Sequence, residues 1–509
     1  MAKQPLLRIE RQVQWTNVHR NISVTVERLY DVTNRWSDGT SPPDVTRFKA
    51  GLAGLSQVVR DAEAAGKRVR AFGGGWSLSK VATTGDYLVN TKLLNAINVG
   101  FKASNVHAKF TGDRQRLVFA QCGTSVMELN RALEPRGLSL PTSGASNGQT
   151  ICGAISTGTH GSNREVGAMQ DFILGLHVVA AGGQSYFIER KSRPVVTDAF
   201  CAVLGATPKR DDNLFNAAIV GLGSFGLVHA VVFEAVPSFS LERYSTRIDY
   251  EAALPVLSTL DFSTLGLARG PVPPTHFEVV INPYAIRRTE RGAHLRYMYQ
   301  LSHAASPAGL GGGSHTAQGQ DVLGILGAAT LIAPGLSKPV AAVAMSTLEE
   351  GGPFTQSLGD TFAATTTAGF IMSCEIGVAQ SDARRAVEAI IGVAGKSPWP
   401  GLCAVRYVKA SPAFMAFTRF APVTCTIELP SAGSSLTAES FERVWDELER
   451  LQIPYTLHWG QMLRYDAARI KAAFGTRVAP WLAARRAFLS PSARNTFSNS
   501  LLQSAGLAG

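Results

Sequence analysis

Residues that mark metal sites and disulfide frameworks are scarce in this sequence. Only six of its 509 residues are cysteines, and they lie far apart without any Cys-x-x-Cys pair. Structural zinc sites and disulfide-stapled folds both need cysteines at characteristic spacings. We therefore expect neither a metal site nor a disulfide framework.

Long apolar runs are also scarce. The first ten residues, Met1 to Glu10, lack an apolar core long enough for a signal peptide. The longest apolar segment, Leu323 to Leu336, is interrupted by Pro334 and is too short to span a bilayer. We expect a cytoplasmic protein without an integral membrane segment. Packing or a subunit interface is our interpretation of residues 323–336, and a contact with a membrane surface is the alternative.

Charged residues make up only 17% of the chain, although the net charge is +11, from 49 Lys and Arg against 38 Asp and Glu. The basic residues are scattered, and clusters such as Arg68/Arg70 and Arg287/Arg288 are short. Because a nucleic-acid-binding protein gathers its basic residues in a patch or stripe, we expect no nucleic-acid partner. The positive charge is suited instead to attracting an anionic cofactor or substrate.

The remaining composition is that of a globular protein. Hydrophobic residues make up 45% of the chain, and it has neither a low-complexity tract nor an internal repeat. A chain of this length exceeds one hydrophobic core of ordinary size, so we expect two domains or three.

One stretch, residues 149–162, is rich in small residues. Six of its fourteen residues are Gly, Ala or Ser, none is charged, and it holds a single imidazole, His160. Missing side chains expose backbone N–H groups and permit positive φ, so such a run lets the main chain touch a flat or phosphorylated ligand. The alternative is a glycine-rich surface loop.

A second glycine loop lies upstream, in Phe72-Gly73-Gly74-Gly75-Trp76-Ser77. Residues 52–65 have helical spacing, and residues 67–72 alternate as a short strand that ends where the glycines begin. Helix, strand and glycine turn in this order are typical of a phosphate-binding arrangement.

A third glycine motif, Gly221 to Gly226, fits the Gly-x-Gly-x-x-Gly pattern of dinucleotide-binding folds. Such a motif follows a strand and opens a helix. Here a predicted helix at 214–220 precedes the glycines and a β-branched strand at 227–236 follows them. The order is inverted, which excludes a nicotinamide site.

Further elements follow from periodicity and turn residues. Strands are predicted at 87–90, 116–121, 172–180, 185–189, 276–281 and 371–378, helices at 125–133, 381–393 and 439–451, and a mobile loop at 304–320.

The first two glycine loops, in this order and at this separation, resemble the FAD-binding domain of the vanillyl-alcohol oxidase (PCMH-type) superfamily. The Ser-Thr-Gly-Thr-His-Gly run at 156–161 resembles its aldonolactone and alditol oxidase branch. The resemblance implies an α+β, two-domain PCMH-type FAD-binding fold with a mixed-sheet substrate (cap) domain. Its expected divisions are an FAD-binding domain at 1–238, a cap domain at 239–465 and a segment at 466–509 that returns to the FAD domain.

The same resemblance implies which residues contact FAD. They are Phe72, Gly73, Gly74, Gly75, Trp76, Ser77, Ser143, Gly144, Thr150, Gly153, Ala154, Ser156, Thr157, Gly158, Thr159, His160 and Val228. Many members carry a histidine at the position of Trp76 and some a cysteine at that of Leu140, and these residues bond covalently to the flavin. Because indole nitrogen is a poor nucleophile, we expect non-covalent FAD. Cys152 is interpreted as a small buried residue.

Two segments late in the chain resemble the branch's substrate site. Arg406-Tyr407-Val408-Lys409 resembles the strand that brings an arginine to the substrate, and His458-Trp459-Gly460-Gln461 resembles a His-Trp-Gly-Lys signature. The implied roles are an oriented cation for Arg406, a carboxylate that accepts a proton or binds a hydroxyl for Glu428, and a polar pocket group for His458. Without the resemblance, Arg406 is an ordinary strand residue and His458 a packed core histidine.

The sequence departs from this branch at two positions. Gln461 replaces the signature lysine, and Ala404 replaces the carboxylate that usually stands two residues before the arginine. These losses disfavour a small polyol as substrate.

The function implied is oxidation of a hydroxyl-bearing small molecule by hydride transfer to flavin N5, with molecular oxygen as acceptor. Gly144 stands where the branch admits oxygen to the flavin, although glycine also suits a turn there. The alternatives are a dehydrogenase with a quinone or cytochrome acceptor, and a flavin-binding protein without turnover.

Overall fold

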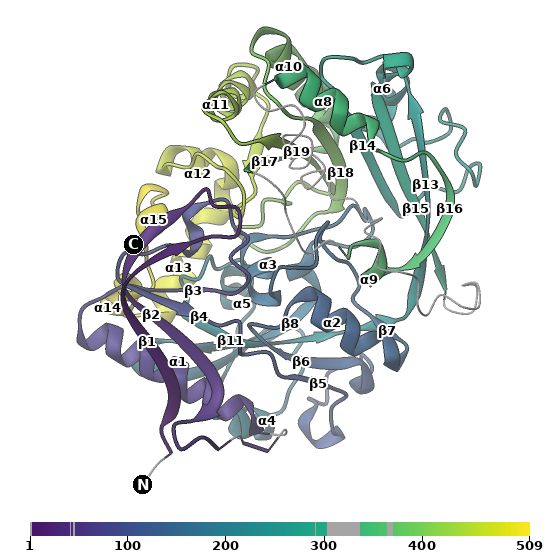
Figure 1. Ribbon diagram of the computed structural model, residues 1–509. Helices are drawn as coiled ribbons and strands as arrows, with labels where there is room; N and C mark the ends of the chain where they lie inside the picture. The colour runs from purple at the N-terminus through teal and green to yellow at the C-terminus, as the bar shows by residue number, and fades with distance from the viewer. Residues whose placement is uncertain (1–2, 41, 44–45, 291, 303–335, 364–369) are drawn as a thin grey trace.

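The computed structural model describes residues 3–40, 42–43, 46–290, 292–302, 336–363 and 370–509. They form two parts, one above the other in Figure 1, which combine helices with several separate sheets. The predicted α+β class is therefore confirmed. Residues 304–320, predicted as a loop, and all of the apolar segment 323–336 except Leu336 lie outside the described residues. No helix among the described residues is long and apolar enough to cross a membrane.

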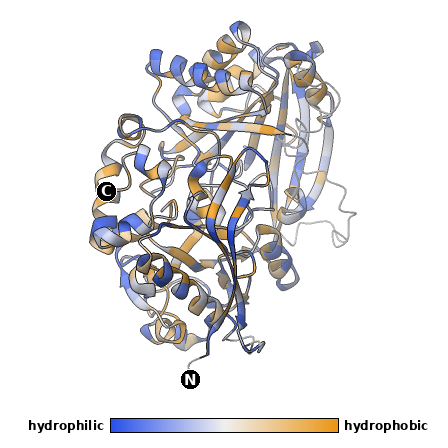
Figure 2. Cartoon of the chain, turned by 60° about the vertical axis from the view of Figure 1, so that its left-hand side comes forward, coloured by the Kyte–Doolittle hydropathy of each residue, from blue (hydrophilic) through white to orange (hydrophobic). Residues whose placement is uncertain are grey.

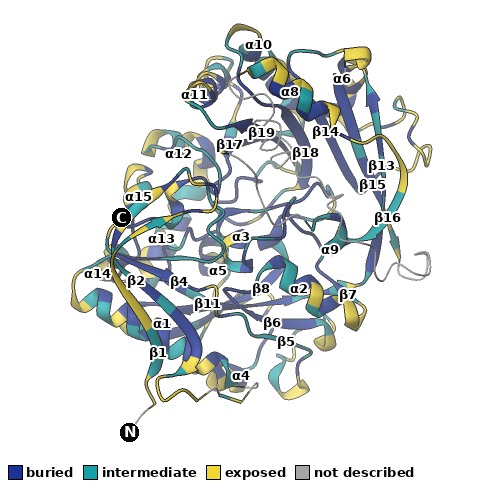
Figure 3. Ribbon diagram, in the orientation of Figure 1, coloured by how far each residue is buried: buried dark blue, intermediate teal, exposed yellow. Residues whose placement is uncertain are grey.

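The first 238 residues contain a four-stranded sheet with both parallel and antiparallel pairs. In spatial order its strands are β1 (Pro5–Thr16), β2 (Ser23–Trp36), β4 (Tyr87–Asn90) and β3 (Val69–Phe72). The outer strand β1 is largely exposed along its length, whereas β4 is buried (Figure 3). The sheet thus presents the end of β3, where the first glycine loop begins, to the interior of the molecule.

A six-stranded sheet lies beside it. Its spatial order is β10 (Thr207–Arg210), β9 (Ser185–Glu189), β8 (Ile173–Val179), β11 (Leu227–Glu234), β6 (Leu117–Gln121) and β5 (Ile97–Val99). The pair β9–β10 is parallel and the other pairs are antiparallel. Every residue of β8 and β6 is buried, as expected for strands covered on both faces. A small antiparallel pair joins β7 (Leu138–Ser139) to β12 (Val236–Pro237).

The helices of this part are short except for the first. They are α1 (Phe48–Ala64), α2 (Val126–Leu133), α3 (Ile151–Thr157), α4 (Asp198–Leu204) and α5 (Asp212–Ala218). Helix α1 buries Leu55, Val58, Val59 and Ala62, the apolar face that its spacing predicts. Ser125 and Glu128 form a capping box that begins α2.

Helix α3 corrects the expectation that the small-residue stretch at 149–162 is a loop throughout. The Thr150 side chain accepts a hydrogen bond from Gly153 N and caps the helix, and Gly158, at φ +89°, ends it. Ile151 and Ile155 are buried in the core. Glycine and serine have weak helix propensity, so composition alone favoured a loop, whereas capping and burial stabilise this short helix.

The second part is built on an eight-stranded sheet. Its spatial order is β16 (Gly351–Ser357), β13 (Phe239–Ile248), β15 (Ala293–Ser302), β14 (His276–Ile281), β18 (Cys403–Lys409), β19 (Val423–Ala432), β17 (Ile371–Ala379) and β20 (Tyr455–Leu457). All its neighbouring strands are antiparallel. The mixture of parallel and antiparallel pairs that was expected in the cap therefore occurs in the first 238 residues instead.

Helices α6 (Tyr250–Thr259), α10 (Ala383–Lys396) and α11 (Ser435–Arg450) pack on one face of this large sheet, and α8 (Ser337–Ser346) packs against Val280 and Ala404 on the opposite face. The short helix α9 (Leu358–Thr361) lies beside α2 of the first part (Figure 1). The helix predicted at 381–393 starts with a 3₁₀ turn before α10. Apolar side chains of α10 and α11 face the sheet and their hydrophilic ones face outward (Figure 2).

Short 3₁₀ turns connect many of these elements. They are η2 (Lys80–Ala82), η3 (Ala103–Asn105), η4 (Arg114–Arg116), η5 (Glu134–Arg136), η6 (Met169–Phe172), η7 (Ala181–Gly183), η8 (Arg288–Glu290), η10 (Gln380–Asp382) and η11 (Gly475–Arg477).

The last helices return to the first part of the molecule. They are α12 (Ala467–Phe474), α13 (Val478–Phe488), α14 (Pro491–Thr496) and α15 (Ser500–Ser504). Helix α13 packs on α5, α14 on α1 and α15 on η2. On this packing, and because the large sheet begins at β13, we propose the division of the chain at residues 238 and 466.

Candidate active site

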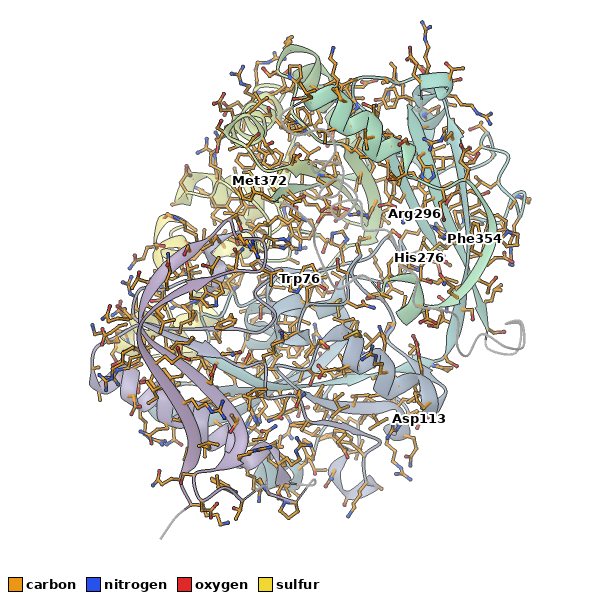
Figure 4. The ribbon with its side chains drawn as sticks, in the orientation of Figure 1. Trp76, Asp113, His276, Arg296, Phe354 and Met372 are labelled. Atoms are coloured by element: carbon orange, nitrogen blue, oxygen red, sulfur yellow. The ribbon has the colours of Figure 1, made fainter. Side chains whose placement is uncertain are left out.

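A large cavity lies where the two parts meet. It encloses about 1590 Å³, part of it open to solvent. Both glycine loops, the turn at Gly221–Gly226 and charged residues of the eight-stranded sheet line it. Figure 4 labels Trp76 of the first glycine loop near the middle of the molecule, and Arg296 on the sheet opposite.

The two glycine loops pack directly against each other. A Cβ atom added to Gly73 would lie 2.1 Å from Thr150 Oγ1, and one added to Gly148 would lie 2.4 Å from Cζ2 of Trp76. No real Cβ atom tolerates such contacts, so both positions need glycine. Gly75 has φ +70°, which also favours glycine. Close packing of glycine backbone against the Thr150 and Trp76 side chains thus forms one wall of the cavity.

The tip of the β1–β2 hairpin covers the first glycine loop. Val18 N donates to Gly75 O at 3.0 Å, and the Trp15 ring lies 5.1 Å from the Phe72 ring. His19 lies 5.5 Å from Trp76, ring centroid to ring centroid, with the rings nearly perpendicular. Trp15 and His19 both line the cavity. Sequence reasoning missed them because nothing local connects this hairpin tip to a glycine loop so much later in the chain.

Most of the residues expected to contact the cofactor line this cavity. They are Phe72, Gly73, Gly74, Gly75, Trp76, Ser77, Thr150, Gly153, Ser156, Thr157, Thr159, His160 and Val228.

Four others lie behind its wall. Ser143 donates to Asn147 Oδ1 at 2.6 Å. A Cβ atom on Gly144 would lie 2.6 Å from Cγ2 of Thr159, Ala154 is buried in the core, and Gly158 faces the Phe417 ring. Their contact with the cofactor stays a prediction.

Opposite the glycine loops, charged side chains form rows across the eight-stranded sheet. In the strand register Arg296 pairs with Glu278 and Glu278 with Arg406. Glu428 pairs with Ala404 on one side and with Glu375 on the other. Paired residues of neighbouring strands lie on the same face of a sheet, so the register brings together residues that are far apart in the sequence.

Arg406 is the centre of this cluster. Its Nε donates to Glu278 Oε1 at 2.7 Å and its Nη1 donates to Glu428 Oε2 at 2.7 Å. Only 7% of Arg406 is exposed, and it lines the cavity. Burial alone raises the pKa of Glu278, but the charges of Arg296 and Arg406 overcome it and lower that pKa to about 2. The guanidinium is thereby fixed in position and orientation.

A second buried pair joins the two parts of the molecule. His160 Nε2 lies 3.0 Å from Glu375 Oε1, and His160 Nδ1 lies 2.8 Å from Gly161 O. Both ring nitrogens thus face oxygen atoms. Burial raises the pKa of Glu375, but the charge of His160 outweighs it and the pKa falls to about 2. Glu375 also lies 3.6 Å from Arg406 Nη1, which links this pair to the cluster.

His458 and Gln461 complete the cavity wall. His458 Nδ1 accepts from Gly460 N at 3.0 Å, and burial lowers its pKa to about 4, so the ring is neutral at pH 7. Gln461 Nε2 donates to Glu428 Oε1 at 3.1 Å. Among the described residues Gln461 Oε1 is buried with no hydrogen-bond partner, which leaves it able to accept from a ligand.

Arg406, Glu428, His458 and Gln461, chosen from the sequence, thus lie in one cavity. Glu278 and Glu375 were missed, although each is a lone charge in an otherwise apolar strand, the signal that should have singled them out.

The residues that line the cavity fit FAD by their hydrogen-bonding groups. Gln149 Oε1 and Gln461 Oε1 are buried acceptors without a partner among the described residues, and both residues line the cavity. Such acceptors suit the N–H and hydroxyl groups of a flavin and its ribityl chain.

Comparison with known proteins agrees with this geometry. Residues 50–187 match the family described as an FAD binding domain. A Neurospora crassa protein, provisionally assigned as a D-arabinono-1,4-lactone oxidase, is 35% identical over 210 residues, which are 41% of this chain and 32% of that protein. The L-gulono-1,4-lactone dehydrogenase of Mycobacterium tuberculosis is 30% identical over 243 residues, 48% of this chain and 47% of that protein. The chain thus spans a third to a half of the length of these relatives.

The fold has solved counterparts as well. A solvent-stable cholesterol oxidase matches with a TM-score of 0.66 and 14% identity, over 98% of both chains. At that identity the match shows the fold alone, and it covers both parts of the molecule. Residues 50–187 therefore match an FAD-binding domain, and the whole chain shares its fold with a cholesterol oxidase. The relatives described above, which it matches over part of their length, are named as an aldonolactone oxidase and an aldonolactone dehydrogenase.

Proposed function

We propose that the protein is an FAD-dependent oxidase that removes a hydride from a carbon bearing a hydroxyl, on a lactone-like sugar derivative, and passes the electrons to molecular oxygen. One observation carries the proposal. The fixed guanidinium of Arg406, the carboxylate of Glu428 and the amide of Gln461 line the same cavity as the glycine loops of the FAD-binding domain.

The protein's own groups account for binding, orientation and proton movement. Bound FAD supplies the hydride acceptor, flavin N5. Arg406 orients a substrate oxygen and stabilises negative charge that develops during the reaction. Glu428 takes the hydroxyl proton, and its bond from Gln461 Nε2 is the one that an incoming hydroxyl replaces. Glu375 is a weaker base because its pKa is about 2.

The remaining polar residues hold this arrangement in place. Neutral His458 is fixed by its bond from Gly460 N and offers a polar edge to the substrate. The pair His160–Glu375 ties the FAD-binding domain to the sheet that carries Arg406. Since Ala404 has no carboxylate, Glu375 and Glu428, which the register places in the same row, supply the acceptors for substrate hydroxyls.

We further propose that FAD is bound without a covalent bond. Trp76, at the position of the histidine that bonds flavin in many relatives, carries an indole, which is a poor nucleophile. Acid precipitation of the purified yellow protein should leave the flavin in the supernatant. Yellow colour in the washed pellet would show a covalent bond, for which His19, beside Trp76, is the first residue to examine.

The decisive test follows the flavin absorbance without oxygen while aldonolactones, alditols and simpler alcohols are added in turn. A lactone or related substrate should bleach the flavin, and aerated buffer should restore it within the time of one turnover. Bleaching that persists in air but is reversed by a quinone or cytochrome would establish a dehydrogenase. A flavin that no member of the panel reduces would indicate a binding protein without turnover.

A further inference from the structure

Strand β1 lies at the edge of the four-stranded sheet, and its outer side is open. Within the described part of the chain it pairs with β2 alone. Five consecutive residues, Arg8 to Gln12, are exposed, and Ile9 among them is 45% exposed although it is large and apolar (Figure 3). The N–H and C=O groups along the outer side of an edge strand can pair with another strand, so this edge is a potential contact surface.

Charged side chains often prevent such pairing, and three of them stand here, at Arg8, Glu10 and Arg11. None of the three forms an ion pair or a side-chain hydrogen bond with another described residue. Asp31 stands opposite Arg8 in β2, but it accepts from Asn90 Nδ2 at 2.9 Å instead. These charges are therefore left for a partner outside the described fold.

The regular part of β1 is short and has a clear centre. Its pairing with β2 runs without a gap from Leu7 to Arg11. The register shifts between Pro5 and Leu7 at one end, and Gln12, with φ +52°, is not among the paired residues at the other. Ile9 is the middle residue of this segment. A second strand that pairs with the whole segment is therefore centred on Ile9.

Antiparallel geometry limits how two copies of β1 can pair. Only alternate residues of an edge strand direct their N–H and C=O groups outward, and each of them must meet an outward-facing residue of the other strand. In a symmetric pair the two-fold axis therefore passes through a residue that meets its own copy. An axis at Arg8, Glu10 or Arg11 sets two like charges opposite each other, which is destabilising. Of the residues from Arg8 to Arg11, Ile9 alone avoids this.

The register centred on Ile9 is also complementary in charge. Arg8 of each copy lies opposite Glu10 of the other, so the axis generates two pairs of opposite charge. Leu7 of each copy lies opposite Arg11 of the other, whose aliphatic stem can cover the leucine. Directly opposite side chains of an antiparallel pair lie on the same face and interact, so both kinds of pair stabilise the contact.

We propose that β1 is an interaction surface for a second copy of this chain, and that the two copies join their four-stranded sheets through antiparallel β1 strands centred on Ile9. The contact is isologous, because each copy presents the same segment, Leu7–Arg11. It is smaller than the roughly 800 Å² per partner of a stable complex, so the dimer forms reversibly, at micromolar concentrations. The proposal does not depend on the flavin chemistry.

The first test places a disulfide on the axis. Opposite Cα atoms of an antiparallel pair lie about 4.5–5.5 Å apart, which is within the range that a disulfide spans. Ile9→Cys treated with a mild oxidant should therefore give a covalent dimer on a non-reducing gel. The wild type is the control for the native cysteines, which are buried except for the partly exposed Cys152.

Gln14→Cys is the matched control for this crosslink. Gln14 is also an exposed residue of β1, but in the register centred on Ile9 it lies far along the strand from its own copy. It should therefore give little covalent dimer. Equal yields from Ile9→Cys and Gln14→Cys would overturn the proposal, because random collision would then account for both.

The second test reverses one charge and measures the monomer–dimer equilibrium by sedimentation velocity at micromolar concentrations. Glu10→Arg sets like charges opposite each other at both pairs and should weaken dimerisation by at least about tenfold. Adding Arg8→Glu reverses both pairs and should restore the affinity. Glu439→Arg makes the same change of net charge on the exposed face of α11 and should have no effect.

Two results of this second test would contradict the proposal. One is a wild-type chain that stays monomeric over the whole range of concentrations. The other is a dimer that Glu10→Arg and Glu439→Arg weaken equally, which would place the contact elsewhere. The oxidase proposal would survive either result, because neither measurement involves turnover.

Discussion

The two walls of the cavity are built in different ways. On the side of the FAD-binding domain the wall is formed by the two glycine loops, with Gly73 and Gly148 so close to Thr150 and Trp76 that a methyl group has no room. On the side of the eight-stranded sheet it is a dense cluster of side-chain charges, in which every carboxylate meets a guanidinium or an imidazole. The first wall is suited to holding a large flat cofactor whatever the substrate. The second is suited to recognising the atoms that react.

This contrast has a thermodynamic side. Glycine contacts act through close packing, because any atom added to these glycines clashes with its neighbours. The charged wall acts through electrostatics, which remain strong only because the cluster is buried. Damage to the first wall should therefore appear in cofactor content, and damage to the second in the rate of flavin reduction.

The largest expected effect is on the charged wall. Arg406→Ala removes the cation shared by Glu278 and Glu428 and should slow flavin reduction on the order of 100-fold, while FAD content stays unchanged. Anaerobic stopped-flow absorbance with a proven substrate measures the rate. The rate of flavin reduction in Arg406→Lys should lie between those of the wild type and of Arg406→Ala, because lysine keeps the charge but not the forked geometry. Loss of FAD together with activity would show that Arg406 serves folding rather than reduction.

The complementary change is on the glycine wall. Gly73→Ala places a Cβ atom on Thr150 Oγ1 and should give protein that loses most of its FAD on gel filtration. The absorbance ratio of flavin to protein reports the loss. Gly392→Ala is the control, because that glycine lies in helix α10 with nothing within 4 Å of the added atom. A Gly73→Ala protein with full flavin content would refute close packing as the reason for these glycines.

Acid should destabilise both parts of the molecule through buried neutral histidines. Burial lowers the pKa of His177 to about 3 and those of His276 and His458 to about 4, from a usual value of 6.5. Below pH 6.5 the unfolded chain binds more protons than the folded one, so stability should fall steadily from pH 6.5 to about 4. Glu375 adds a lower window, because its contribution is complete above its usual 4.5 and is lost as the pH falls to about 2.

Urea unfolding midpoints at pH 7, 5.5 and 4.5, followed by tryptophan fluorescence, check this prediction. In His458→Gln the urea midpoint should change less with pH than in the wild type, since glutamine has no proton to gain. A midpoint that is constant between pH 7 and 4.5 would mean that these rings are solvated and not buried.

The smallest expected effect concerns access of oxygen. Gly144 lies behind the cavity wall, and a Cβ atom there would lie 2.6 Å from Cγ2 of Thr159, which lines the cavity. Gly144→Ala should therefore push Thr159 inward and slow reoxidation of the reduced flavin several-fold without changing its reduction. Mixing reduced protein with aerated buffer measures the rate. The double change Gly144→Ala with Thr159→Ser removes the contacting methyl and should restore the rate if displacement of Thr159 is the cause.

Much of the glycine wall could be predicted from the sequence, because its determinants are local. The turn after β3 follows from a short alternating strand and three glycines. The apolar face of α1 follows from helical spacing. The order of helix, glycines and strand around Gly221–Gly226 is enough to exclude a nicotinamide site, and the elements observed on either side have that order. Helix α3 was not predicted because its residues have weak helix propensity. A side-chain cap and burial in the core stabilise it instead.

The charged wall could be predicted only in part. Arg406, Glu428, His458 and Gln461 came from a resemblance in two short segments, and their roles remain proposals. Glu278 and Glu375 stand far apart in the chain, and only the register of antiparallel strands sets both beside Arg406. No periodicity in a single strand encodes the register of the next one, so the pattern of charges across neighbouring strands is invisible in the sequence.

The sequence by itself indicated the FAD-binding domain through a resemblance carried by two local glycine loops, in which glycine supplies backbone freedom. Only the tertiary structure decided what faces the cofactor. It placed the β1–β2 hairpin over the glycine loop, paired His160 with Glu375, and buried Arg70 and Arg485 at one turn with the end of the chain. These contacts join residues far apart in the sequence, and their strength comes from burial in a low dielectric, which exists only once the chain has folded.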